Sequence, residues 1–115
     1  MTNASLEPER RSASIRYIRQ ALAAAAPVHD KWLPMSATAS KANELRVATR
    51  YLKAALELLQ DDDGAHWEAA APLQEAQATL YHIGASDLDG ALRLTKQALD
   101  EIAQHRTDQG GRVPA

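Results

Sequence analysis

The residues best suited to chemistry in this chain are four histidines and a run of three aspartates. The segment "DDDGAH" contains Asp61, Asp63 and His66, whose carboxylate and imidazole groups are typical ligands of divalent metals. His105 joins them if the segments that carry these residues fold back antiparallel. The run lacks the ordered ligand spacing of an EF-hand loop. Aspartates before a helix also cap its free N–H groups and complement its dipole. Capping is therefore the favoured interpretation, and a metal site is the alternative.

Three more residues, His29, Tyr81 and His82, form a candidate ligand site. If the segments fold back antiparallel, this site is expected at the end of the molecule opposite the aspartates. The stretch "HIGASD" also places a histidine, a serine and an acid close together in sequence. Its alternative interpretation, a helix that ends at Gly84 and a new helix capped by Ser86 or Asp87, is the favoured one. No nucleophile elbow, glycine-rich phosphate loop or paired-histidine zinc motif occurs. We therefore predict no enzyme activity, no catalytic residue and no cofactor.

Three basic residues, Arg46, Arg50 and Lys53, have the spacing of one helical stripe. Nucleic-acid binding requires a basic surface with few competing acids. Here residues 54–92 contain eight acidic residues and no lysine or arginine. This layout favours a protein partner over a nucleic acid, and it also favours pairing between helices, with Arg50 expected near Glu75.

The stretch "PVHDKWLPM", residues 27–35, is expected to be a linker, because two prolines stiffen it and disfavour helix before each of them. Trp32 and Leu33 have two interpretations. They form an apolar plug over the end of the bundle, which is favoured, or they are an exposed anchor for a partner. The candidate partner-binding residues are accordingly Trp32, Leu33, Arg46, Arg50 and Lys53.

Four segments carry apolar residues at helical spacing, and no strand-like alternation appears. Pro8 suits a first helical turn, Pro27 is expected to end the first segment, and Pro72 is expected to kink or break the third. Short connections between the later segments favour antiparallel neighbours. The sequence thus predicts an all-α, antiparallel up-down four-helix bundle with helices over residues 8–26, 38–60, 65–83 and 86–106.

Alanine supplies 24 of the 115 residues and phenylalanine none. Alanine favours helix but buries little apolar area, so such a core gains from further burial against a partner. We predict one domain over residues 7–106, with a flexible N-terminus at residues 1–6 and a disordered tail at residues 107–115. A homodimer or a complex with a protein partner is the expected assembly.

The absence of cysteine excludes disulfides and thiolate metal sites. The N-terminal residues lack the apolar stretch of a secretory signal, and no segment is apolar enough over about 20 residues to cross a bilayer. We predict a cytoplasmic protein that does not associate with membranes.

The central segment resembles the YfdX family of bacterial helical proteins. The resemblance rests on "KWLPM", the helical run "RYLKAALELL" and "HWEAA", and it covers about 40 of the 115 residues. It implies a helical fold. Members of that family are exported with a signal peptide, whereas the N-terminal sequence here does not resemble one.

Together these features predict a non-catalytic helical binding or assembly module that associates with itself or with a protein partner. The alternative is a helical bundle that binds a small molecule or a metal through the histidines and aspartates at one end.

Overall fold

The computed structural model describes residues 8–61 and 66–111, with side chains up to Ala103. In this part of the chain it contains no strand, and a 3-10 helix precedes each of the last two α-helices. The all-α prediction is confirmed. In chain order the elements are α1 (Pro8–Trp32), α2 (Ala39–Gln60), η1 (His66–Ala69), α3 (Ala70–Ile83), η2 (Ser86–Leu88) and α4 (Asp89–Gly111).

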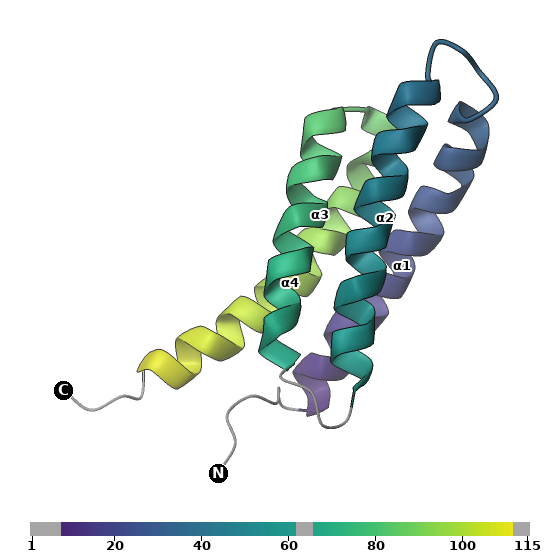
Figure 1. Cartoon of the computed structure of the whole chain (residues 1–115). Helices are drawn as coiled ribbons and strands as arrows, with labels where there is room; N and C mark the ends of the chain where they lie inside the picture. Colours follow the sequence, from purple (N-terminus) through teal and green to yellow (C-terminus); the bar gives the residue numbers. More distant parts are fainter. Residues whose placement is uncertain (1–7, 62–65, 112–115) are drawn as a thin grey trace.

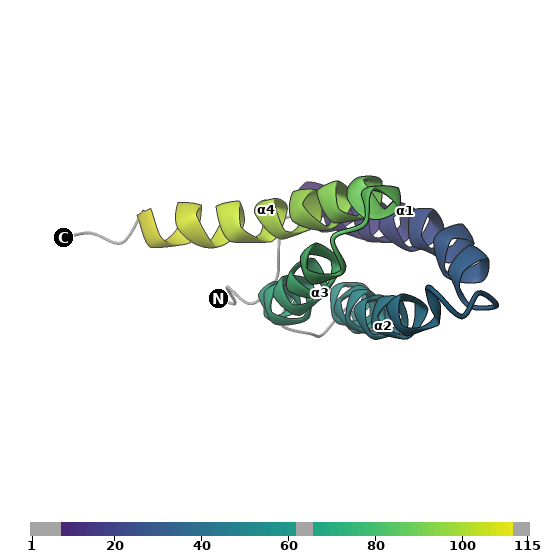
Figure 2. The same cartoon turned by 90° about the horizontal axis from the view of Figure 1, so that it is seen from above.

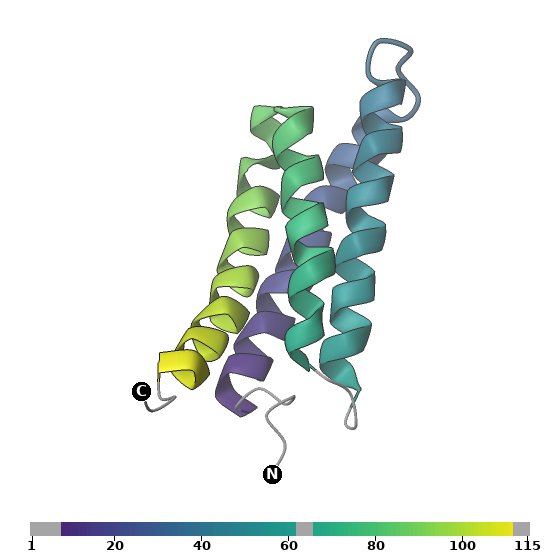
Figure 3. The same cartoon turned by 60° about the vertical axis from the view of Figure 1, so that its left-hand side comes forward.

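The α-helices run up and down and pack around a shared core, as the sequence predicts (Figure 1). Helix α1 packs against α2 and α4, and α3 packs against the same two neighbours from the other side. Viewed along the bundle, α1 and α3 therefore lie at opposite corners (Figure 2). The α1–α2 loop and the α3–α4 turn lie at one end of the bundle, which we call the upper pole (Figures 1 and 3). The opposite end is the lower pole.

Leucines and alanines alternate along the buried face of α2. Leu45, Leu52 and Leu59 are fully buried, and so are Ala48 and Ala55 between them. This spacing of three and four residues keeps one stripe of a 3.6-residue helix on the core side. The small alanines leave room for close approach of neighbouring helices, and the leucines fill the remaining volume.

Helix α1 does not end at Pro27, so the prediction of a linker over residues 27–35 is wrong for residues 27–32. The helix continues to Trp32, with Pro27 inside it. The apolar spacing explains the continuation, because Val28 and Trp32 prolong the core stripe of Ala25 beyond the proline and pack into the upper core. Their burial offsets the loss of the hydrogen bond that proline cannot donate.

Replacing Pro27 with alanine is expected to stabilise the protein by about 1 kcal/mol. Alanine restores a backbone donor in the helix interior and removes the clash of the proline ring with the preceding turn, although it makes the unfolded chain more flexible. Chemical denaturation would measure the change, with Pro34→Ala in the α1–α2 loop as control. A destabilised Pro27→Ala variant together with an unchanged Pro34→Ala variant would contradict this account of α1.

The starts of two helices differ from the usual capping pattern. Thr38 is the N-cap residue of α2, but its hydroxyl donates to the carbonyl of Trp32 at 2.8 Å instead of accepting from a helical N–H. The second difference concerns "SDLD", where η2 starts at Ser86 without a side-chain cap and α4 follows at Asp89. Gly84 ends α3 with φ of 69°, as expected for a glycine at this position.

The third helical segment begins as a 3-10 helix and becomes α-helical at Ala70, so its break lies before Pro72. Pro72 then falls in the first turn of α3, where its missing N–H removes no helical bond. Helix α4 continues to Gly111, beyond the end expected at Arg106. Within the described residues, no helix combines the length and the apolarity of a bilayer-spanning segment.

Candidate functional site

The fold separates the three residues of the candidate ligand site. His29 lies on the face of α1 that borders α2, whereas Tyr81 borders a hollow between α3 and α4. His82 is exposed on α3. Because those two grooves lie on different sides of the bundle, His29 is not brought together with Tyr81.

At the lower pole, His66 is almost fully buried, and its Nε2 lies 2.6 Å from the carbonyl oxygen of Asp61. This contact ties the first turn of η1 to the end of α2. Asp63 and the side chain of His105 fall outside the described residues. Within the described part of the chain, no three potential metal ligands gather.

Trp32 is 5% exposed and lies in one buried cluster with Leu45 of α2, Leu80 of α3 and Leu88 of η2. It is therefore the plug, and the prediction of Trp32 as an exposed partner anchor is wrong. The spacing along α1 places it on the core side, since α1 stays helical up to this residue. The adjacent Leu33 lies outside the helix and is 43% exposed, so it remains accessible to a partner.

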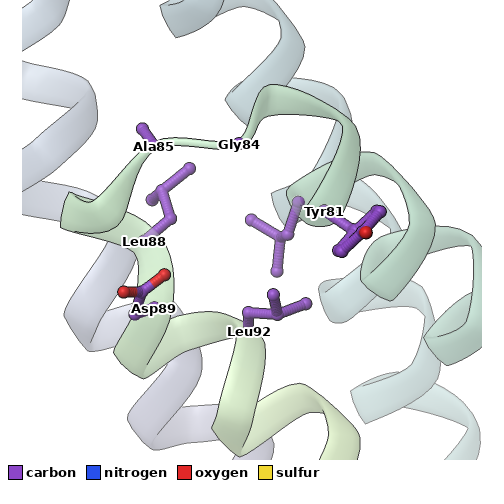
Figure 4. Close-up of a pocket in the computed structure, with 7 residues that line it drawn as sticks. Tyr81, Gly84, Ala85, Leu88, Asp89 and Leu92 are labelled. Carbon is purple, nitrogen blue, oxygen red and sulfur yellow. The ribbon is translucent and has the colours of Figure 1, made fainter.

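A hollow of about 430 Å³ lies between the upper ends of α3 and α4, and we call it the α3–α4 hollow. Figure 4 shows the side chains of Leu88 and Leu92 directed into it, with Tyr81 and Asp89 at its edge. Tyr81 is 76% exposed, the largest value among the large apolar and aromatic side chains of the described residues. The lining is mostly apolar and its one acidic member is Asp89, a composition that suits a docked apolar side chain better than a polar reaction.

A second hollow, of about 280 Å³, lies between α1 and α2, and we call it the α1–α2 hollow. Its lining contains two of the three residues of the predicted basic stripe, Arg46 and Lys53, and also His29. Arg50 is not part of this lining, and it forms no ion pair with Glu75 among the described contacts, contrary to the prediction. The complete lining is Leu22, Ala26, His29, Asp30, Arg46, Thr49 and Lys53.

The described cross-helix ion pairs involve α1. Arg10 Nη1 lies 3.5 Å from Glu101 Oε1 on α4, and Lys31 Nζ lies 2.7 Å from Asp87 Oδ2 on η2. Asp87 is the acid of "HIGASD", so its carboxylate faces Lys31 of another helix. These pairs are solvent-accessible and each contributes about 0.5 kcal/mol, which helps to orient α1 against α4.

Several hydroxyl groups that could act as nucleophiles are committed to the backbone. The buried Ser14 and Thr95 hydroxyls donate to the carbonyls of Ala98 and Ala91 at 3.5 and 2.8 Å. The hydroxyls of Thr49 and Thr79 likewise donate to carbonyls of their own helices. A nucleophile needs a neighbouring base, and these groups face carbonyl oxygens instead.

Sequence reasoning missed the combination of His29 with Arg46 and Lys53, because it placed His29 in a linker. The signal was present: Leu22, Ala26 and His29 have the i, i+4, i+7 spacing of one helical face. Comparisons of the chain with protein-family models, with curated proteins and with solved structures found no match.

Proposed function

We propose that this protein is a non-catalytic helical assembly module that binds a second copy of itself through the upper pole. The observation that carries the proposal is that exposed apolar side chains occur on two parts of this pole. Leu33 and Met35, in the α1–α2 loop, are 43% and 53% exposed, and Tyr81, which borders the α3–α4 hollow, is 76% exposed. Single exposed apolar residues are ordinary, whereas several at one end of a small bundle fit an interaction site.

The shape of the pole favours a second copy as the occupant. The α1–α2 loop extends past the α3–α4 turn, which leaves a step at this end of the bundle (Figures 1 and 3). Two such steps fit together when one copy is turned over, so that each loop covers the α3–α4 end of the other. The same two surfaces are then used on both copies, which gives a closed dimer with twofold symmetry.

Charge supports the same pairing. Asp89 borders the α3–α4 hollow, and the exposed Lys41 lies in the first turn of α2, next to the loop. In the proposed dimer the loop of one copy approaches the hollow of the other, so opposite charges face each other. Such rim charges contribute more to orientation than to affinity.

Size-exclusion chromatography with light scattering tests this proposal. We expect the unchanged chain to have twice the mass of a monomer at high micromolar concentration, and the double substitution Leu33→Ser/Met35→Ser to shift it to monomer. Val47→Ser is the matched control, because Val47 is 42% exposed on α2 away from the loop. A strict monomer at that concentration, or a dimer that the double substitution leaves intact, would overturn the proposal.

A further inference from the structure

The α1–α2 hollow has features of a small ligand site that the apolar upper pole does not share. Its lining contains two apolar side chains of α1, Leu22 and Ala26. It also contains three nitrogen-bearing side chains, His29 from α1 and Arg46 and Lys53 from α2. A volume of about 280 Å³ lies near the lower end of the range for small-molecule sites, about 300 Å³, so a compact ligand fits it best.

His29 provides an unused hydrogen-bonding atom. Its Nδ1 lies 3.5 Å from Asp30 Oδ1, while its Nε2 is shielded from solvent and has no hydrogen-bond partner. Buried polar atoms are nearly always paired, because an unpaired one loses its bonds to water without replacement. Because Nε2 is shielded in this conformation, a rotation of the imidazole toward the hollow is needed before a ligand oxygen can accept a hydrogen bond from it. With the proton on Nε2, that bond would remove the deficit.

The charges around the hollow favour a negatively charged ligand. Arg46 and Lys53 form no ion pair with any described residue, so their charges are not neutralised within the fold. The one carboxylate in the lining belongs to Asp30, whose side chain is 82% exposed and which lies beside His29. The Thr49 hydroxyl donates to the Arg46 carbonyl at 2.8 Å. The remaining donors around the hollow are cationic or imidazole groups, which suits an oxyanion.

We propose that the α1–α2 hollow binds a small molecule through a compact oxyanion, a phosphate or a carboxylate, held by His29 Nε2, Arg46 and Lys53. The guanidinium of Arg46 matches two oxygens of such a group, and the ammonium of Lys53 supplies a further charge. The site differs from the self-association surface in residues and in ligand chemistry. Its test therefore does not depend on whether the protein is a dimer.

Isothermal titration calorimetry with inorganic phosphate, and separately with citrate, tests the proposal at constant ionic strength set by sodium chloride. We expect at least one of the two anions to bind and to raise the melting temperature. A response to phosphate alone identifies a phosphate site, and a response to citrate alone identifies a carboxylate site. Absence of heat and of a thermal shift with both anions would overturn the proposal.

Variants then assign the binding to this hollow. His29→Gln, Arg46→Gln and Lys53→Gln are each expected to weaken binding about tenfold or more, because each removes a charged or donor contact. Arg50→Gln and His82→Gln are the matched controls, since they remove an exposed arginine of α2 and an exposed histidine outside the hollow. Equal weakening in the controls would show nonspecific attraction by surface charge and would contradict the site.

Discussion

Replacing Trp32 with alanine is expected to destabilise the protein by about 3–5 kcal/mol, because it removes the largest side chain of the upper core and leaves a cavity. The indole is 5% exposed and packs against residues of α2, α3 and the α3–α4 turn, such as Leu45, Leu80 and Leu88. The surrounding alanines are too small to close the space. Urea or thermal denaturation followed by circular dichroism would measure the loss.

Leu33→Ala is the matched control for this measurement. Leu33 is the next residue in the chain, yet it is 43% exposed outside the helix, so its truncation is expected to change the free energy of unfolding by less than about 1 kcal/mol. Equal stabilities of the two variants would mean that Trp32 is not packed in the core.

Enlarging an alanine of the core is expected to have the second largest effect. Ala55 is fully buried and lies in the lower core among Leu52, Leu59 and Leu73. Leucine at this position adds volume where the helices approach closely, which costs about 1–3 kcal/mol in shifted backbone and strained rotamers. We therefore expect Ala55→Leu to lower the midpoint of denaturation.

The neighbouring Ala54 provides the control on the same helix. It is exposed, and leucine has a helix propensity close to that of alanine, so Ala54→Leu is expected to leave stability nearly unchanged. Destabilisation by Ala54→Leu, with Ala55→Leu tolerated, would require the opposite face of α2 to point into the bundle.

The sequence was sufficient for the fold class and for the buried stripe of α2, because both depend on helical periodicity. The stripe of leucine and alanine from Leu45 to Leu59 is buried throughout, and Gly84 ends α3 with a positive φ. Both follow from local rules, the 3.6-residue repeat and the backbone freedom of glycine.

The errors arose where packing between distant segments outweighed a local preference. Pro27 favours a helix end, but burial of Val28 and Trp32 keeps α1 helical beyond it. Thr38 is a good N-cap residue, yet its hydroxyl bonds the Trp32 carbonyl across the loop. The expected ion pair between Arg50 and Glu75 is absent among the described contacts. The spacing of three charges along a helix does not show which side chain faces a neighbouring helix.

The same error concealed the α1–α2 hollow. With α1 ending at Ala26, His29 has no defined position, and Arg46 and Lys53 appear only as surface charges. Once α1 continues to Trp32, one helix places His29 beside α2 and Trp32 in the core. Both the stability of the upper pole and the proposed anion site therefore depend on the helical continuation through Pro27.

Amide hydrogen exchange measured by nuclear magnetic resonance over residues 18–37 tests this continuation most directly. The structure predicts protection that persists past the proline to Leu33, whose N–H donates to the His29 carbonyl at 2.9 Å. Protection that stops at Ala26, with the amides of residues 28–33 exchanging as in an unfolded chain, would contradict it.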